Sequence, residues 1–157
     1  MKKLFVLVVS LSFLFSCSED MVTYQDQLEK DIKIIEKYLA DSNLVAQSTK
    51  SGLHYIIEQE GNGNFPPAYS YVKVKYTGKF INGEVFDDNT DTEGTTFGLA
   101  GGIINGWKEG IPLFSVGGKG KLFIPSGLGY GSTGFFGIPA NAVLIFDIEL
   151  VTYFPPD

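Results

Sequence analysis

The sequence contains no arginine, one histidine and one cysteine among its 157 residues, and its net charge is −6. Nucleic-acid binding needs a basic surface that usually includes arginine, so we expect no nucleic-acid partner. A single cysteine excludes a disulfide within the chain, and a single histidine leaves little for a metal site. We therefore expect neither a metal nor another cofactor. Hydrophobic residues make up 44% and aromatic residues 14% of the chain, enough to supply a packed core.

Two features that suggest chemistry are interpreted as structural. His54, the sole histidine, lies in a predicted strand over residues 53–58, where we expect a half-exposed side chain without a catalytic role. An acidic segment over residues 87–93 lacks the ligand spacing and the glycine of an EF-hand loop, so we interpret it as a solvated loop. Nucleotide, metal and covalent chemistry are all disfavoured.

The N-terminus has the pattern of a secretory signal. Two lysines precede an apolar run over residues 4–15, which is too short to cross a bilayer because a spanning helix needs about 20 apolar residues. Leu14-Phe15-Ser16-Cys17 resembles the cleavage motif of bacterial lipoproteins. We predict a signal peptide at 1–16 and a lipidated tether at 17–23, attached through Cys17. An ordinary signal peptide with an incidental cysteine is the alternative.

The residues after the cysteine bear on localisation. Ser18, in place of aspartate, resembles the sorting choice of many outer-membrane lipoproteins. The Glu19-Asp20 pair resembles surface-export signals of some Bacteroidetes, although an acidic tether explains it equally. We predict a protein of the bacterial cell envelope, lipid-anchored in the outer membrane. Both the periplasmic face and the cell-surface face of that membrane are compatible with the sequence.

The next segment has helical periodicity. Leu28, Ile32, Ile35 and Leu39 recur at spacings of three and four, which predicts an amphipathic helix over residues 24–39 within a helical arm at 24–49. One such helix cannot fold alone, so its apolar stripe needs a partner. Packing on its own domain is the simplest interpretation, with dimerisation or contact with a client as alternatives.

The remainder alternates in the manner of strands. Strands are predicted at 53–58, 71–80, 119–124 and 142–153, with one short helix at 106–113. Asn82-Gly83 predicts a tight hairpin turn, because this pair tolerates positive φ at both central positions. Several antiparallel strands with one helix indicate an α+β domain with one covered sheet face.

Three groups of residues carry a resemblance to a known family. They are Val74-Lys75-Tyr76-Thr77-Gly78 with Gly83-Glu84-Val85-Phe86-Asp87; Ile103-Ile104-Asn105-Gly106-Trp107 with Gly110; and Tyr130-Gly131 with Pro139 through Leu150. In order and spacing the chain resembles the FKBP-type peptidyl-prolyl cis-trans isomerases, in their bacterial lipoprotein form. The resemblance implies an FKBP-like curved antiparallel β-sheet wrapped around one short helix, forming an isomerase domain at 50–157.

The resemblance also implies the residues of the site. The expected catalytic pocket has Trp107 as its floor, and its other members are Tyr76, Phe86, Asp87, Ile103, Ile104, Tyr130 and Phe146. Phe97, Phe135 and Ile138 are expected to extend substrate binding. The Tyr130 hydroxyl and the Ile104 backbone N–H are the expected donors to a bound carbonyl.

The implied activity is isomerisation of X-Pro bonds in proline-containing unfolded or exported polypeptides, without covalent chemistry, and with macrolides as candidate inhibitors. Two loops, 91–102 and 132–138, depart from the family pattern, and Thr95 stands where a second pocket phenylalanine is common. These departures favour an alternative, a catalytically weak FKBP-like chaperone or assembly-factor binding module. An unrelated carrier of apolar ligands is a third reading, but it needs no such ordered motifs.

Overall fold

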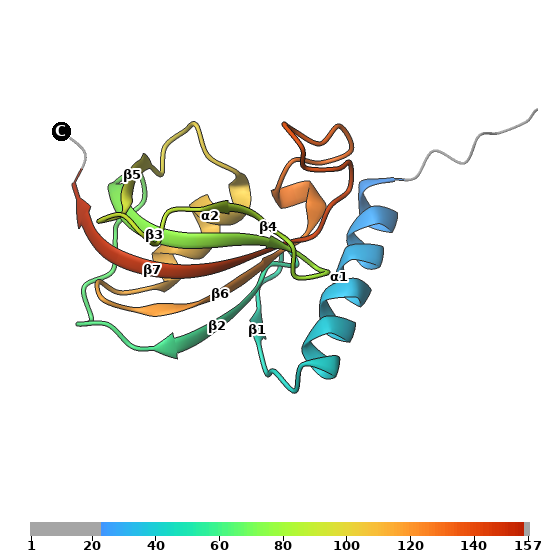
Figure 1. Cartoon of the computed structure of the whole chain (residues 1–157), viewed down its shortest axis with the longest axis horizontal. Coiled ribbons are helices and arrows are strands. Elements are labelled where there is room, and N and C mark those ends of the chain that lie inside the picture. Colours follow the sequence, from blue (N-terminus) through green and yellow to red (C-terminus); the bar gives the residue numbers. More distant parts are fainter. Residues whose placement is uncertain (1–22, 156–157) are drawn as a thin grey trace, which may run out of the picture.

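The computed structural model describes residues 23–155, which form a curved antiparallel sheet with one helix on its concave face and another against one end of its convex face (Figure 1). The helices are α1 (Tyr24–Asp41) and α2 (Asn105–Gly110), with 3₁₀ turns η1 (Ile111–Leu113) and η2 (Ser126–Leu128). The strands are β1 (Gln47–Ser48), β2 (His54–Gln59), β3 (Tyr71–Phe80), β4 (Val85–Asp88), β5 (Thr95–Gly98), β6 (Lys119–Ile124) and β7 (Leu144–Phe154). The predicted signal peptide, Cys17 and most of the predicted tether lie outside the described residues.

The sheet order is β1-β2-β6-β7-β3-β4, and β5 also pairs with β3. The long strand β7 is central, because it pairs antiparallel with both β3 and β6. The bounds predicted for β3 and β6 agree with the structure, and β2 and β7 are displaced by one or two residues. The predicted α+β class is confirmed. None of the helices within residues 23–155 is long and apolar enough to span a membrane.

The main core lies between the concave face of the sheet and α2. Alternate residues of β7 point inward, and Leu144 and Leu150 are fully buried there. Two glycines bring α2 unusually close to β6: a Cβ at Gly106 would lie 2.5 Å from Ile124, and one at Gly110 would lie 2.7 Å from Leu122. Side chains on α2 therefore reach directly over the sheet.

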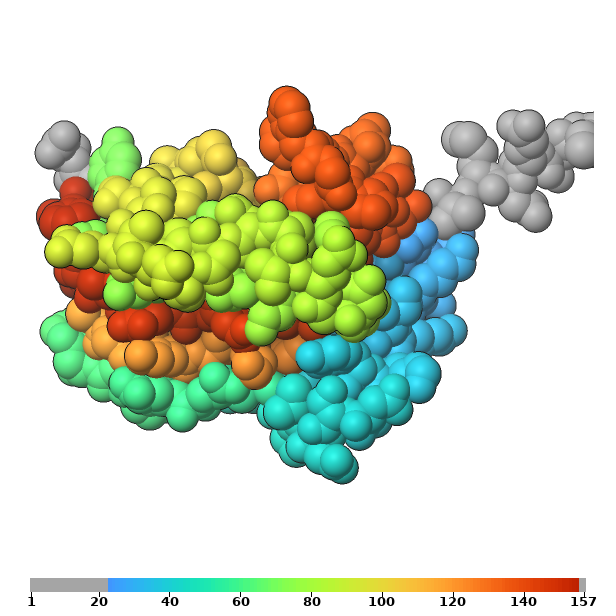
Figure 2. Space-filling view, viewed as in Figure 1, coloured from blue at the N-terminus to red at the C-terminus, as the bar shows by residue number. Residues whose placement is uncertain are grey.

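The convex face is also covered at one end, by α1, which corrects the expectation of a single covered face. Ile35 and Leu39 of α1 pack with Phe123, Val143 and Ile145 in a second core cluster. The helix thus packs on its own domain. In Figure 2 it lies against the body of the molecule, beside the projecting loop of residues around 130–140.

The ends of α1 follow from local hydrogen bonds. Thr23 and Asp26 form a capping box, in which each side chain accepts from the other residue's backbone N–H, so the predicted tether ends in a helix cap. The helix continues two residues beyond the predicted end. A charged residue, Asp31, is buried in it, whereas Leu28 and Ile32 of the predicted stripe are only half-buried.

The predicted hairpin turn joins β3 to β4, whereas the prediction for His54 is wrong. In the β3–β4 hairpin only Gly83 has positive φ, at 87°, and the Gly83 N–H donates to the Phe80 carbonyl, so the turn needs one left-handed residue rather than two. His54 begins β2 and is buried at 9% exposure, not half-exposed. Its Nδ1 lies 2.9 Å from the Gly52 carbonyl oxygen, which satisfies that ring nitrogen.

Candidate active site

A small cavity of about 150 Å³ opens between the concave face of the sheet and the start of α2. It is much smaller than a site for a drug-sized ligand, which typically measures about 300–1,000 Å³, so it suits one small ring. Its lining residues are Tyr76, Phe86, Asp87, Phe97, Gly102, Ile103, Ile104, Trp107, Tyr130 and Phe146. All eight residues predicted to be catalytic are therefore brought together from β3, β4, α2, β7 and two loops. Their part in binding substrate stays a prediction.

Trp107 lies in the first turn of α2 and is buried at 4% exposure. Its ring meets three other rings edge to face, with centroid distances of 4.9 Å to Tyr76, 5.1 Å to Phe97 and 5.2 Å to Phe146. Such T-shaped contacts are the favoured geometry of aromatic pairs. Among the described residues the indole Nε1 has no hydrogen-bond partner. The ring is thus held by packing alone.

One wall depends on the absence of a side chain at Gly78. This glycine pairs with both Asp87 of β4 and Phe146 of β7. A Cβ there would lie 2.7 Å from the Phe86 ring and 3.0 Å from the Phe146 ring. The two rings therefore fill the space over Gly78 and meet edge to face at 5.6 Å. Their position over this glycine shapes the cavity.

The polar groups of the cavity are few. The Tyr76 hydroxyl donates to Asp87 Oδ2 at 2.6 Å. Burial, and then this hydrogen bond, raise the pKa of Tyr76 well above its usual value. Burial, and then the charge of Asp87, also raise the pKa of Tyr130. Both phenols therefore stay protonated near neutral pH and keep their capacity to donate.

The two donors predicted to meet a substrate carbonyl have no partner within residues 23–155. Neither the Tyr130 hydroxyl nor the Ile104 backbone N–H donates to a described atom. Ile104 is the N-cap residue of α2, and its carbonyl accepts from the Trp107 N–H at 3.0 Å, which fixes the backbone beside Trp107. Both donors are free to bind a ligand at the rim.

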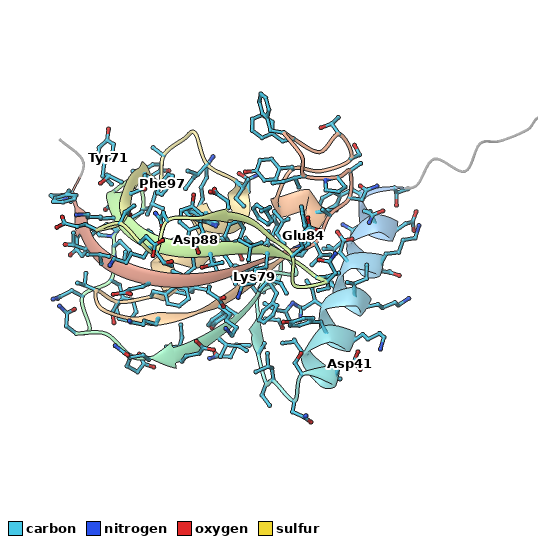
Figure 3. All side chains as sticks on the ribbon, viewed as in Figure 1. Asp41, Tyr71, Lys79, Glu84, Asp88 and Phe97 are labelled. Atoms are coloured by element: carbon cyan, nitrogen blue, oxygen red, sulfur yellow. The ribbon has the colours of Figure 1, made fainter. Side chains whose placement is uncertain are left out.

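The three residues expected to extend substrate binding, Phe97, Phe135 and Ile138, lie in different places. Phe97 of β5 lines the cavity. It does so although Thr95 stands at the sequence position where a second pocket phenylalanine is expected. Phe97 is labelled in Figure 3, above the sheet. Phe135 lies outside it, in an adjoining groove of about 420 Å³ that shares Gly102, Ile103, Ile104 and Tyr130 with the cavity. Ile138 lines neither hollow. It packs against the core and pairs with Phe135 across a tight turn.

That turn carries an exposed aromatic tip, which consists of Phe135 and Phe136. The Phe135 ring stacks on Tyr130 at a centroid distance of 5.4 Å and an angle of 3°. Phe136 stands at the turn with a positive φ of 34° and an exposure of 93%. A bulky residue in this conformation is uncommon, and exposure leaves its ring without burial. The tip therefore adds apolar surface next to the cavity.

Sequence reasoning did not identify Gly102 as part of the site. Its φ is 75°, and the Gly101-Gly102 pair was the available signal for a bend in this loop. Gly78 belongs to the Tyr76-Thr77-Gly78 motif, but the motif does not predict its steric role. Both glycines contribute because they have no side chain, and a residue without a functional group gives no sign in the sequence that it belongs to a binding site.

Comparisons with known proteins agree with the geometry. A family model described as FKBP-type peptidyl-prolyl cis-trans isomerase matches residues 63–151. The chain is 47% identical to FkpA of Aeromonas hydrophila over 124 residues, covering 77% of this chain and 46% of that protein. It is 42% identical to FK506-binding protein 1 of Dictyostelium discoideum over 106 residues, covering 65% of this chain and 98% of that protein.

Solved structures show the same likeness. The crystal structure of FkpA from Escherichia coli aligns with a TM-score of 0.71 at 37% identity, covering 83% of this chain and 64% of that one. A peptidyl-prolyl cis-trans isomerase from Pseudomonas syringae aligns with a TM-score of 0.68 at 28% identity, covering 80% of this chain and 94% of that one. The chain spans about half the length of the FkpA proteins that it matches in sequence.

Proposed function

The chain belongs to the FKBP-type peptidyl-prolyl cis-trans isomerase family, and we propose that it accelerates rotation of X-Pro bonds in unfolded or exported polypeptides. The observation that carries the proposal is one small aromatic cavity with two unpaired donors at its rim. Trp107 would form the floor under a proline ring. The Tyr130 hydroxyl and the Ile104 N–H would hold the neighbouring carbonyls.

The chemistry of the reaction fits such a site. Rotation about a peptide bond has a barrier of about 18–20 kcal/mol because conjugation must be broken. The twisted amide loses charge separation, so an apolar cavity favours it over the planar ground state. Each tenfold gain in rate needs about 1.4 kcal/mol of binding that is stronger in the transition state. Neither a nucleophile nor a general base is needed, in keeping with a cavity that contains no histidine or cysteine.

The direct test is an isomerisation assay on residues 18–157. We expect acceleration with proline peptides, at rates that depend on the residue before proline. Tyr130→Phe removes one donor and should lower kcat/KM by about threefold to tenfold, the loss expected for one hydrogen bond. Tyr69→Phe is the matched control, because it removes the same hydroxyl from an exposed side chain of 70% exposure and should change nothing.

A binding module with weak or absent turnover is the second candidate, and the exposed Phe136 tip favours it. Such a protein would hold apolar client segments through the tip and the groove under Phe135. The same assay separates the two functions. Wild-type protein that accelerates none of a panel of peptides with varied residues before proline, yet binds them, would replace the enzyme by the binding module.

The activity should not depend on pH between about 6 and 9. The ordinary pKa of tyrosine is about 10, and burial moves those of Tyr76 and Tyr130 upward, away from this range. A raised pKa keeps each hydroxyl protonated, so the donors persist. Profiles of kcat/KM against pH check this. A fall centred near pH 6.5 would instead implicate a titrating group such as a histidine and contradict a mechanism that needs no general base.

Inhibition by macrolides is proposed on the same geometry. The cavity is too small for a whole macrolide, but it joins the groove lined by Phe135, and the two hollows together offer a larger continuous surface. We expect one ring of the inhibitor in the cavity and the remainder along the groove. Competition between the inhibitor and a proline peptide would test this arrangement.

We further propose that the chain is exported and lipid-anchored through Cys17, with the isomerase domain in the cell envelope and the outer membrane as its destination. The support is the order of lysines, apolar run and cysteine in the first 17 residues. Palmitate labelling of producing cells should mark the wild-type protein and not Cys17→Ala. Equal labelling of the two, or none of either, would favour an ordinary signal peptide.

A further inference from the structure

A buried carboxylate joins the N-terminal helix to the loop that carries Tyr130. Asp31 of α1 is 1% exposed, and its Oδ2 accepts hydrogen bonds from the Ser126 backbone N–H at 2.8 Å and the Ser126 hydroxyl at 2.6 Å. Its Oδ1 accepts from Gln27 Nε2 at 2.7 Å. Ser126 is also 1% exposed and lies 95 residues along the chain. Asp31 thus caps the 3₁₀ turn η2 from a distant helix.

The network continues from Ser126 to the cavity. The Ser126 carbonyl accepts from two backbone N–H groups, Gly129 at 3.0 Å and Gly131 at 2.8 Å. Tyr130 lies between these two glycines and lines the cavity. The orientation of Ser126 therefore fixes the backbone on both sides of Tyr130. A shift of Ser126 would move the ring and its hydroxyl at the rim.

The energetics of Asp31 are unusual for a purely packing residue. A buried charge is costly unless it is paired or fully hydrogen-bonded. Within the described residues no lysine forms an ion pair with Asp31, so its charge is compensated by three hydrogen-bond donors. A hydrophobic residue would pack α1 at lower cost. Unlike a hydrophobic side chain, the carboxylate fixes the orientation of Ser126, because it accepts hydrogen bonds from both its backbone N–H and its hydroxyl.

We propose that Asp31 is a positioning residue for Tyr130, and that α1 is therefore part of the functional unit rather than a spacer. This inference rests on the proposed isomerase function. Asp31 does not touch the cavity, so it acts through Ser126 and the backbone of Gly129 and Gly131. The effect of losing Asp31 should depend on whether Tyr130 is present.

A double-mutant cycle tests that dependence. Asp31→Ala should lower kcat/KM by about tenfold and Asp31→Asn, which keeps one acceptor oxygen and the volume, by about threefold; tenfold corresponds to about 1.4 kcal/mol. In the Tyr130→Ala background, Asp31→Ala should cost less than about twofold, because the ring it positions is gone. A loss of the same size in both backgrounds would overturn the proposal, since it would indicate a general effect on the fold. Assays are run where circular dichroism shows every variant folded.

The control is Asp41→Ala, which removes one negative charge from the same helix. Asp41 lies at the outer end of α1 and pairs with Lys37, away from η2 (Figure 3). It should leave kcat/KM unchanged within about twofold, as expected for an exposed ion pair.

Hydrogen exchange gives a readout that does not need catalysis. Asp31→Asn should speed exchange of the Gly129 and Gly131 amides, whereas Asp41→Ala should not. Unchanged exchange at both glycines would overturn the positioning role whether or not the protein is an isomerase. An inactive wild-type protein would instead overturn the proposed function, and the exchange data would then decide the coupling of Asp31 to the Tyr130 loop.

Discussion

Replacing Trp107 by alanine is expected to lower kcat/KM by more than about a hundredfold, equivalent to about 2.8 kcal/mol of barrier. The indole ring lines the cavity, where we propose that it forms the floor, and it contacts the rings of Tyr76, Phe97 and Phe146. Its loss would remove the surface under a bound proline and let three walls collapse inward. The free energy of unfolding should also fall, by about 3–5 kcal/mol, as for other buried tryptophans replaced by alanine.

The loss of stability must be separated from the loss of activity. Phe114→Ala is the matched control, because Phe114 is buried at 1% exposure in the same core but does not line the cavity. It should destabilise the fold to a similar degree and retain most of the activity at a temperature where the protein stays folded. Trp107 is the only tryptophan, so the Trp107→Ala variant has none, and unfolding is followed by circular dichroism rather than by tryptophan fluorescence. Equal activities of Trp107→Ala and Phe114→Ala would contradict the assigned floor.

The same tryptophan is a reporter of ligand binding in the wild-type protein. Since its ring faces the cavity, a proline peptide that enters should alter the intrinsic fluorescence in a saturable way. Because the chain has only this tryptophan, a change in its emission reports a change in the candidate site. Binding detected elsewhere, with unchanged tryptophan emission, would favour the groove or the Phe136 tip as the principal contact.

The sequence predicted best those elements whose periodicity reports burial directly. In β3 and β7, alternate residues face the concave core, so their strands and inward faces were evident from the pattern. The prediction for His54 is wrong because the alternating pattern of a strand predicts a half-exposed side chain at this position, whereas the structure buries it. The fold places it at the start of β2, where the Gly52 carbonyl contacts its ring. Local alternation could not reveal that contact.

Asp31 shows the limit of reading a helix by itself. It lies four residues before Ile35 and eight before Leu39, which puts it on the buried face, but an aspartate there is ordinarily assigned to solvent. The partner that makes its burial tolerable is Ser126, far along the chain. Long-range pairs of this kind become visible only when two distant segments are placed together. The same applies to the stacking of Phe135 on Tyr130.

For the candidate site, ordered motifs predicted which residues meet, and the structure adds how closely they do so. The cavity contains the expected rings, yet its width depends on Gly78 and its rim on Gly102. Neither glycine has a side chain that could donate, accept or pack. Gly78 lets the Phe86 and Phe146 rings approach its backbone closely, a property of the folded pairs β3–β4 and β3–β7, whereas Gly102 contributes a left-handed backbone with a φ of 75°.

Gly78→Ala should therefore impair the site while sparing most of the fold. The added Cβ would lie 2.7 Å from the Phe86 ring and 3.0 Å from the Phe146 ring, closer than packed carbon atoms approach. Overpacking of this kind typically costs about 1–3 kcal/mol, and the two rings would be displaced toward the cavity. We expect kcat/KM to fall by about tenfold or more, because misplaced binding groups lose transition-state contacts. Isomerisation assays and denaturant unfolding measure the two effects.

Gly101→Ala provides the control, because a Cβ there meets no atom within 4 Å and the residue precedes the cavity loop at Gly102 without lining the cavity. It should leave activity unchanged and slightly stabilise the protein, since alanine restricts the unfolded chain more than glycine does. Phe86→Leu in the Gly78→Ala background should then recover part of the lost activity by relieving the clash. If Gly78→Ala keeps full activity, Phe86 and Phe146 can move away from the cavity, and their contacts over Gly78 do not set its width.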